Sequence, residues 1–212
     1  MRHESSTVIA LVGQLSGGLL AALGAPGNMS VIRAGSQRPD AARPAAPHRS
    51  AGWEPGASAM REAARRRATY VVVANDPLAG VASAWRDMWD LASGPGDAAA
   101  FEEQATATLA AWRGKQFELP DYYLVVTPAQ HLAAGPDLYL GPLRAARPRR
   151  VAVAAALDAA ADPDGPAVTA SLLDTLRSLE HGPWWPPLGE LLEAARRFYA
   201  GGLAETQQAR YS

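Results

Sequence analysis

Three side chains that could take part in acid–base chemistry follow the predicted strands of this chain. Asp76 comes shortly after the apolar run at 69–74, Thr127 ends the run at 122–127, and His131 follows it. In an open parallel sheet, ligands bind outside the carboxyl ends of the strands, so these side chains would converge at one edge. A carboxylate, a hydroxyl and an imidazole there could form an acid–base pair or a weak metal site. Asp76, Thr127 and His131 are therefore the candidate catalytic residues.

Simpler explanations exist for most of these residues. Asp76 precedes proline, and this pair is typical of a helix start in which the carboxylate caps the helix. Thr127 also precedes proline, which turns the chain out of the strand. His131 has no structural role that the sequence reveals, although a single loop histidine is more often exposed than catalytic. Asp158, Asp162 and Asp164 follow the third predicted strand, and loop solvation accounts for the last two.

The sequence carries no established catalytic or cofactor motif. It has no GxxxxGK[ST], GxSxG or HExxH pattern, and its glycines at 13, 17 and 18 lack the GxGxxG spacing of a dinucleotide-binding turn. The chain has no cysteine, which excludes a disulfide framework, a thiolate nucleophile and a cysteine zinc site. We predict no cofactor and no bound metal, and the residues leave open whether the protein is an enzyme.

A second group of candidate residues is suited to binding a partner. Trp184 and Trp185 lie between prolines in the stretch HGPWWPP, and tryptophan is enriched at the energetic centres of interfaces. Arg147, Arg149 and Arg150 precede the third predicted strand, where they could form a basic patch for an acidic partner. Alternatively, the tryptophans roof the core, and the arginines complement a helix terminus and discourage aggregation. Aromatic residues do not alternate with the arginines, so we do not expect nucleic acid binding.

The elements that would position these residues are short apolar strands separated by helices. Runs of β-branched, aromatic and alanine residues predict strands at 69–74, 122–127 and 149–155. Apolar spacings of three and four predict helices near 77–93, 97–113, 138–147, 168–179 and 187–200. The order β-α-α-β-α-β-α-α predicts an α/β domain over 68–200, in which helices cover both faces of a small parallel sheet. Gly201-Gly202 is expected to end the last helix, leaving a flexible tail at 201–212.

Residues 1–67 are expected to be a poorly structured Gly/Pro/Arg-rich region outside this domain. They carry nine arginines and four acidic residues, a net charge of +5, whereas residues 68–212 carry eleven basic and seventeen acidic residues, a net charge of −6. The apolar opening at 7–23 resembles a weak signal-peptide core. Alternatively, it forms a strand and a helix, which would add a fourth strand to the predicted three. Met60 is a credible alternative start, which would place the whole region upstream of the protein.

The overall charge indicates no strong electrostatic target, and the absence of catalytic motifs, the Trp and Arg features and the short sheet favour a binding module. The formal net charge of −1 provides no general attraction to nucleic acid or acidic membranes. Our first hypothesis is a small α/β module that binds another protein within a larger assembly. The alternative is a small-molecule hydrolase or transferase that uses Asp76, Thr127 and His131. We expect a cytoplasmic location without membrane association, with secretion through the apolar opening as the lesser alternative.

Overall fold

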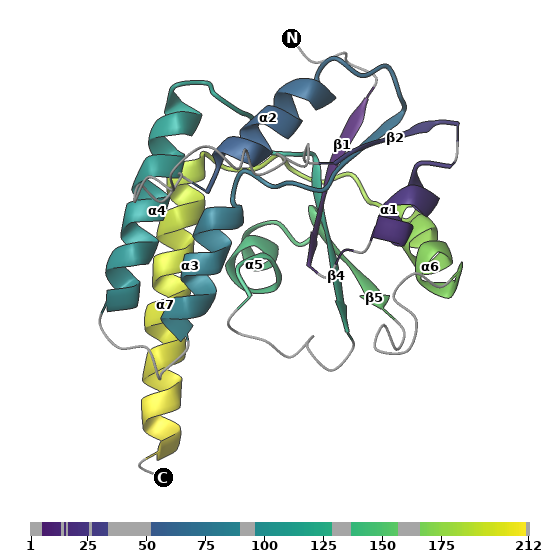
Figure 1. Ribbon diagram of the computed structural model, residues 1–212. Helices are drawn as coiled ribbons and strands as arrows, with labels where there is room; N and C mark the ends of the chain where they lie inside the picture. The colour runs from purple at the N-terminus through teal and green to yellow at the C-terminus, as the bar shows by residue number, and fades with distance from the viewer. Residues whose placement is uncertain are drawn as a thin grey trace, which may run out of the picture.

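Strand β1 (Thr7–Gly13) lies at the centre of a parallel sheet. The computed structural model describes residues 6–13, 15, 17–25, 27–33, 52–89, 96–128, 137–156 and 166–210. The other strands are β2 (Met29–Ile32), β3 (Tyr70–Val73), β4 (Tyr122–Pro128) and β5 (Val151–Ala156). Their order is β2-β3-β1-β4-β5, and every neighbouring pair is parallel (Figure 1). The predicted α/β class with a parallel sheet is confirmed.

β1 is buried because Val8–Val12 is an uninterrupted apolar run, as expected for a strand covered on both faces. It is paired with β3 on one side and with β4 on the other. The N–H of Val8 donates to Asp121 Oδ2 at 2.6 Å, and the N–H of Asp121 donates to the Val8 carbonyl at 2.7 Å. β1 therefore joins the two halves of the sheet.

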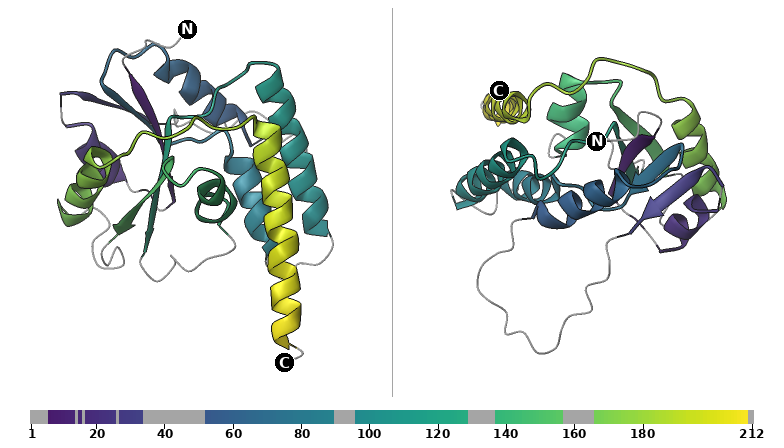
Figure 2. Two further views of the ribbon diagram at one scale, coloured as in Figure 1. Left: turned by 180° about the vertical axis from the view of Figure 1, so that it is seen from behind. Right: turned by 90° about the horizontal axis from the view of Figure 1, so that it is seen from above.

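Helices cover both faces of the sheet, as the sequence predicts (Figure 2). α1 (Gly17–Leu23) and α6 (Pro166–Arg177) lie together on one face. The opposite face carries α2 (Glu54–Ala63), α3 (Ala79–Trp89), α4 (Gly96–Arg113), α7 (Leu188–Arg210) and a π-helical turn, η2 (Tyr139–Leu143), which continues into α5 (Arg144–Ala146). Alternate residues along β1 and β3 point to these two layers, so each face has its own apolar core.

An aromatic cluster joins the helices of the larger layer. In α3, apolar residues recur at spacings of three and four, which brings Val81, Trp85 and Met88 to the buried side. Trp85 is fully buried, and its ring centroid lies 5.6 Å from that of Phe101 in α4 and 6.0 Å from that of Tyr199 in α7. α3, α4 and α7 therefore pack as one unit beside the sheet.

The prediction that residues 1–67 lie outside the domain is wrong for the described parts of this region, whereas residues 34–51 lie outside the described residues. β1, α1, β2 and α2 all come from this region, and Met60 is buried in α2. The sheet consequently has five strands, where the sequence predicts three or four. The apolar opening forms the strand and the helix that the sequence offers as its alternative, whereas β2 is missed because it is a short and only partly buried strand, MSVI, without a longer apolar run. A chain that began at Met60 would lack the central strand.

The predicted strands of the second half of the chain agree with the structure to within two residues at each end. The predicted end of the last helix does not agree, because α7 continues through Gly201-Gly202 to Arg210. In Figure 1, the C-terminal turns of α7 extend beyond the other helices. The sequence prediction fails here because two glycines weaken a helix without necessarily ending it.

Candidate functional site

Asp76 lies just beyond the carboxyl end of β3, and both of its carboxylate oxygens accept hydrogen bonds from tyrosines. The hydroxyl of Tyr123, in β4, donates to Oδ1 at 2.9 Å, and that of Tyr139, in η2, donates to Oδ2 at 2.6 Å. The backbone N–H of Leu78 also donates to the carboxylate, in the turn that precedes α3. All three side chains of this network are buried, and Asp76 is only 4% exposed.

Burial raises the pKa of Asp76 from 3.8 to about 6, because a carboxylate loses its hydration in a buried site. The hydrogen bonds from Tyr139, Leu78 and Tyr123 stabilise the charged form and oppose this shift, but they do not cancel it. Burial, followed by the charge of Asp76, raises the pKa of both tyrosine hydroxyls well above the usual range. Both tyrosines are therefore protonated donors at neutral pH.

The position of Tyr139 depends on the local backbone of η2. Asp137 Oδ1 accepts the N–H of Tyr139 at 2.8 Å, which holds the start of the turn. The N–H of Leu143 then donates to the Leu138 carbonyl, five residues earlier, at 3.1 Å. Pro142 lies inside this turn and has no N–H to donate, which is compatible with a wider turn than an α-helix has.

This geometry suits a buried anchor better than a catalytic centre. A general base must come within hydrogen-bond distance of its substrate. In Asp76, both oxygens already accept bonds from protein hydroxyls, and the side chain is almost inaccessible to solvent. The network connects the end of β3 to residues 47 and 63 positions further along the chain.

Thr127 is not brought into contact with Asp76 in the described part of the chain. It pairs with Ala155 in the sheet, and no hydrogen bond joins it to the carboxylate. His131 lies outside the described residues, as do Asp158, Asp162 and Asp164. The convergence of Asp76, Thr127 and His131 therefore stays a prediction.

The glycines after β1 have a structural explanation. Gly13 has a φ of 107°, and a Cβ there would lie 2.0 Å from the Val126 carbonyl oxygen, so only glycine fits. Gly13 and Gly18 have the spacing of the glycines in the phosphate-binding pattern GxxxxGK[ST]. Leu19 and Leu20 stand where that pattern has its lysine and hydroxyl residue, and Leu19 is buried. These residues do not supply the phosphate-binding amine or the Mg²⁺-binding hydroxyl.

The tandem tryptophans divide between the core and the surface. Trp185 is buried, its Nε1–H donates to the Pro120 carbonyl at 2.7 Å, and its ring packs against Tyr123 at 5.6 Å. Trp184 has 47% of its area exposed, the largest exposure of any large hydrophobic residue described. One ring therefore roofs the core, as the sequence suggests, and the other is presented to solvent.

The three predicted partner-binding arginines hold the backbone around these tryptophans. Arg147 Nε donates to the Trp184 carbonyl at 2.7 Å. Arg150 donates to the carbonyls of Gly182 at 2.7 Å and Pro183 at 3.1 Å, and its guanidinium lies 4.8 Å from the Trp184 ring centroid. Arg149 pairs with Glu180 at 3.1 Å. The segment that contains Trp184 is thus attached to the residues that precede β5.

Two adjoining hollows lie where this segment meets α4 and α7. The first has a volume of about 600 Å³ and is lined by Trp112, Glu118, Leu119, Trp184, Trp185, Pro186 and Pro187. The second has a volume of about 650 Å³ and is lined by Leu109, Trp112, Arg113, Pro187, Gly189, Glu190, Glu193, Arg196 and Arg197. Because Trp112 and Pro187 line both hollows, we treat them as one surface, the Trp184 groove.

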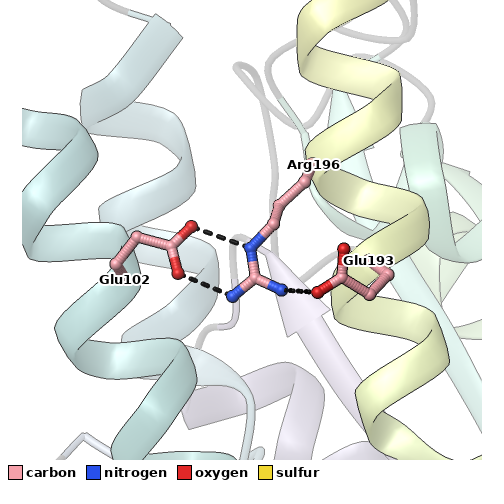
Figure 3. Close-up of polar contacts among 3 residues, drawn as sticks. All are labelled: Glu102, Glu193 and Arg196. Carbon is pink, nitrogen blue, oxygen red and sulfur yellow. Dashed lines mark hydrogen bonds and ion pairs between the residues drawn. The ribbon is translucent and has the colours of Figure 1, made fainter.

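An ion-pair cluster fixes the two helices that form one end of the Trp184 groove (Figure 3). Arg196 of α7 binds Glu102 of α4 through two parallel hydrogen bonds, 2.8 Å from Nε and 2.6 Å from Nη2. Its remaining nitrogen, Nη1, binds Glu193. The hydrogen bonds from Arg196 lower the pKa of Glu102, so the pair is charged at neutral pH.

Trp112 and Arg113 are not among the site residues that the sequence predicts. Trp112 stands out in the sequence only as an apolar residue on one face of a predicted helix. The one available signal is its position beside Arg113 in the last turn before Gly114.

No protein-family model matches the chain, and no curated protein or solved structure is significantly similar to it. Among the residues that the structure describes, no group of three or more His, Cys, Asp or Glu is arranged to hold a metal ion. No helix in the same part of the chain has the length and apolar character to cross a membrane. The function is therefore inferred from geometry alone.

Proposed function

We propose that the protein is a small α/β binding module that recognises a partner protein through the Trp184 groove. One observation carries this proposal: Trp184 is 47% exposed, although its backbone carbonyl is held by Arg147 and its ring lies against Arg150. A large aromatic side chain on a fixed backbone loses little conformational entropy on binding. Such residues are typical of the few that dominate the energy of an interface.

The second large exposed hydrophobic residue of the described chain does not have these properties. Phe198 is 36% exposed, and its ring packs against Trp85 and Trp89 at 6.4 and 6.5 Å. It does not line the Trp184 groove. Phe198 is therefore explained as the edge of the aromatic cluster, and it provides a matched control for Trp184.

In this proposal, the arginines act from within the protein. Arg147 and Arg150 order the backbone of the 181–187 segment, so that Trp184 is already in place when a partner arrives. The alternative function, a small-molecule hydrolase or transferase, requires a reactive group that a substrate can reach. Asp76 is buried under two tyrosines, which supports the binding module over the enzyme. A cytoplasmic location within a larger assembly accompanies the proposal.

Site-specific photocrosslinking tests the proposed function. A photoreactive amino acid at Glu190, which lines the groove, should give a discrete protein adduct in the cells that make this protein. The same amino acid at Asp174, which is exposed in α6 on the opposite face, should not give that adduct. Trp184→Ala should abolish the adduct, whereas Phe198→Ala should preserve it. Adducts that are identical at Glu190 and Asp174, or that persist in Trp184→Ala, would show that the groove is not the binding surface.

A further inference from the structure

We infer that the partner segment bound by the Trp184 groove is an extended, acidic peptide that contains proline. This inference rests on the proposed function and concerns only the chemistry of the partner. Three properties of the groove carry it, namely the shape of the lining, the elements that form it and the charges around it.

Rings make up most of the apolar lining, with Leu109 and Leu119 beside them. Trp112 and Trp184 supply indole rings, and Pro186 and Pro187 supply pyrrolidine rings. Grooves lined by aromatic rings are the surfaces on which polyproline II segments dock, because their proline rings stack on the aromatic faces. A polyproline II segment is also extended before it binds, so that it loses little entropy.

The elements around the groove exclude recognition by strand addition. Its lining residues come from α4, α7 and the irregular segments at 117–119 and 184–187, and none belongs to a strand. Strand addition requires the free edge of a sheet, where backbone groups are available for pairing. The groove would therefore bind a peptide through contacts of its own side chains, which is how polyproline II segments are recognised.

The charges around the groove favour an acidic peptide. Arg149 is compensated by Glu180, whereas Arg196 is shared by Glu102 and Glu193, so that cluster has a net charge of −1. Arg113 and Arg197 line the groove, while Arg147 and Arg150 support it through backbone carbonyls, which do not neutralise their charge. Against these four positive groups stand Glu118, Glu190 and the net charge of −1 of the Arg196 cluster, so the balance is four minus three, or +1. A carboxylate on the peptide would be attracted to either pair of arginines.

The same charges disfavour a nucleic acid at this surface. Glu118, Glu190 and Glu193 all line the groove, where they would face a continuous phosphate backbone. A peptide can place its carboxylates beside the arginines and its prolines beside the glutamates, whereas a phosphate chain cannot.

Peptide binding to the full chain tests the inference. The probe is a synthetic peptide of repeated Glu-Pro-Pro-Leu-Pro units, and its binding is followed by calorimetry and tryptophan fluorescence. Trp184→Ala should weaken binding by about tenfold or more, as expected for the loss of an interface anchor. Arg113→Gln combined with Arg197→Gln should weaken it by roughly three- to tenfold and reduce its dependence on salt. Phe198→Ala and Arg177→Gln, both outside the groove, should leave the affinity unchanged.

Matched probes decide each part of the inference. A peptide with Gln in place of Glu that binds equally well would overturn the acidic requirement. A peptide with Ala in place of Pro that binds equally well would overturn the extended proline-containing class, and preferential binding of a single-stranded oligonucleotide would overturn both. Circular dichroism verifies that each variant is folded, and Trp184→Phe, with a smaller ring at the same position, should show an intermediate loss if Trp184→Ala unfolds.

The crosslinking experiment separates this inference from the proposed function. A Trp184-dependent adduct at Glu190, with no binding of the acidic proline peptide, would leave the binding module standing and overturn the peptide class. The absence of both would overturn both.

Discussion

The hydroxyl of Tyr139 donates to Oδ2 of Asp76 at 2.6 Å, and this bond joins residues 63 positions apart in the sequence. It places the π-helical turn η2 against the end of β3, inside the core on the helix-rich face of the sheet. The carboxylate is buried with an elevated pKa, so its environment and its protonation state are linked to the stability of the fold.

Replacing Tyr139 by phenylalanine should destabilise the protein more at pH 8 than at pH 5. The variant removes one donor from a buried carboxylate that is charged at the higher pH, at a cost of about 2 kcal/mol in the free energy of unfolding. Urea denaturation at both pH values measures the difference. Tyr199→Phe is the control, because the Tyr199 hydroxyl donates to the neutral carbonyl of Met88 and its loss should not depend on pH. Equal losses for Tyr139→Phe at both pH values would contradict the assignment of a charged acceptor.

Asp76 should make the protein less stable as the pH rises from 4 to 8. Its pKa is raised in the folded state, to about 6 from 3.8, so the folded protein binds this proton more tightly than the unfolded chain does. Its stabilising contribution is complete below pH 3.8 and is lost as the pH rises through 6. The pKa shift, 6 minus 3.8, corresponds at 1.36 kcal/mol per pH unit to a contribution of about 3 kcal/mol to the free energy of unfolding.

Asp76→Asn tests this pH dependence because it removes the titrating group. The free energy of unfolding of the wild type should fall by roughly 2.4 kcal/mol relative to that of the variant between pH 4 and pH 8. Glu102→Gln is the control of opposite sign, because the pKa of Glu102 is lowered by Arg196 and its contribution is lost at low pH. Parallel pH profiles for the wild type and Asp76→Asn would show that Asp76 is not responsible.

Gly56→Ala should destabilise the protein although alanine is the better helix former. A Cβ at Gly56, inside α2, would lie 2.1 Å from the Pro77 nitrogen and 2.2 Å from the Asp76 carbonyl carbon, and backbone atoms cannot move aside cheaply. We expect a loss of about 3 kcal/mol, measured by thermal or urea unfolding. Gly17→Ala at the start of α1, where an added Cβ would meet no atom within 4 Å, should change stability by less than about 1 kcal/mol. A neutral Gly56→Ala would mean that α2 does not approach the Asp76–Pro77 backbone this closely.

A fragment of residues 60–212 should not fold on its own. It lacks β1, α1 and β2, so β3 and β4 lose the strand that lies between them. We expect no cooperative unfolding transition and poor dispersion in its NMR spectrum, in contrast to the full chain. Addition of a separate 1–59 fragment should restore part of the folded signal if the missing strand is the cause. A well-dispersed spectrum of 60–212 alone would refute the central position of β1.

The strands of the second half of the chain could be predicted because each is a contiguous apolar run between clear boundaries. β1 has the same character, but Gly13, Gly17 and Gly18 make its surroundings resemble a broken segment. The close approach of β4 explains why Gly13 must be glycine, and that approach depends on the strand order. Strand order itself arises from packing between distant segments, which a local pattern does not contain.

The contacts at the candidate surfaces also depend on packing between distant segments, which local sequence patterns do not contain. The position of Asp76 at the carboxyl edge follows from the rule for parallel sheets, but its partners Tyr123 and Tyr139 depend on β4 and η2 lying beside it. The arginines before β5 and the exposed Trp184 are both visible in the sequence as separate features. Their contact depends on the path of the 181–187 segment past the start of β5, which only the folded chain shows.

The central place of β1 also has a consequence for biosynthesis. β1 leaves the ribosome before either of its neighbours, and its bond from Val8 to Asp121 must wait for 113 further residues. At translation rates of about 5–20 residues per second, this gap of 113 residues corresponds to roughly 6–23 s. During that interval the side of β1 that pairs with β4 has no permanent neighbour in the nascent chain. Chaperones that bind this edge of β1 during synthesis are therefore expected to raise the yield of folded protein.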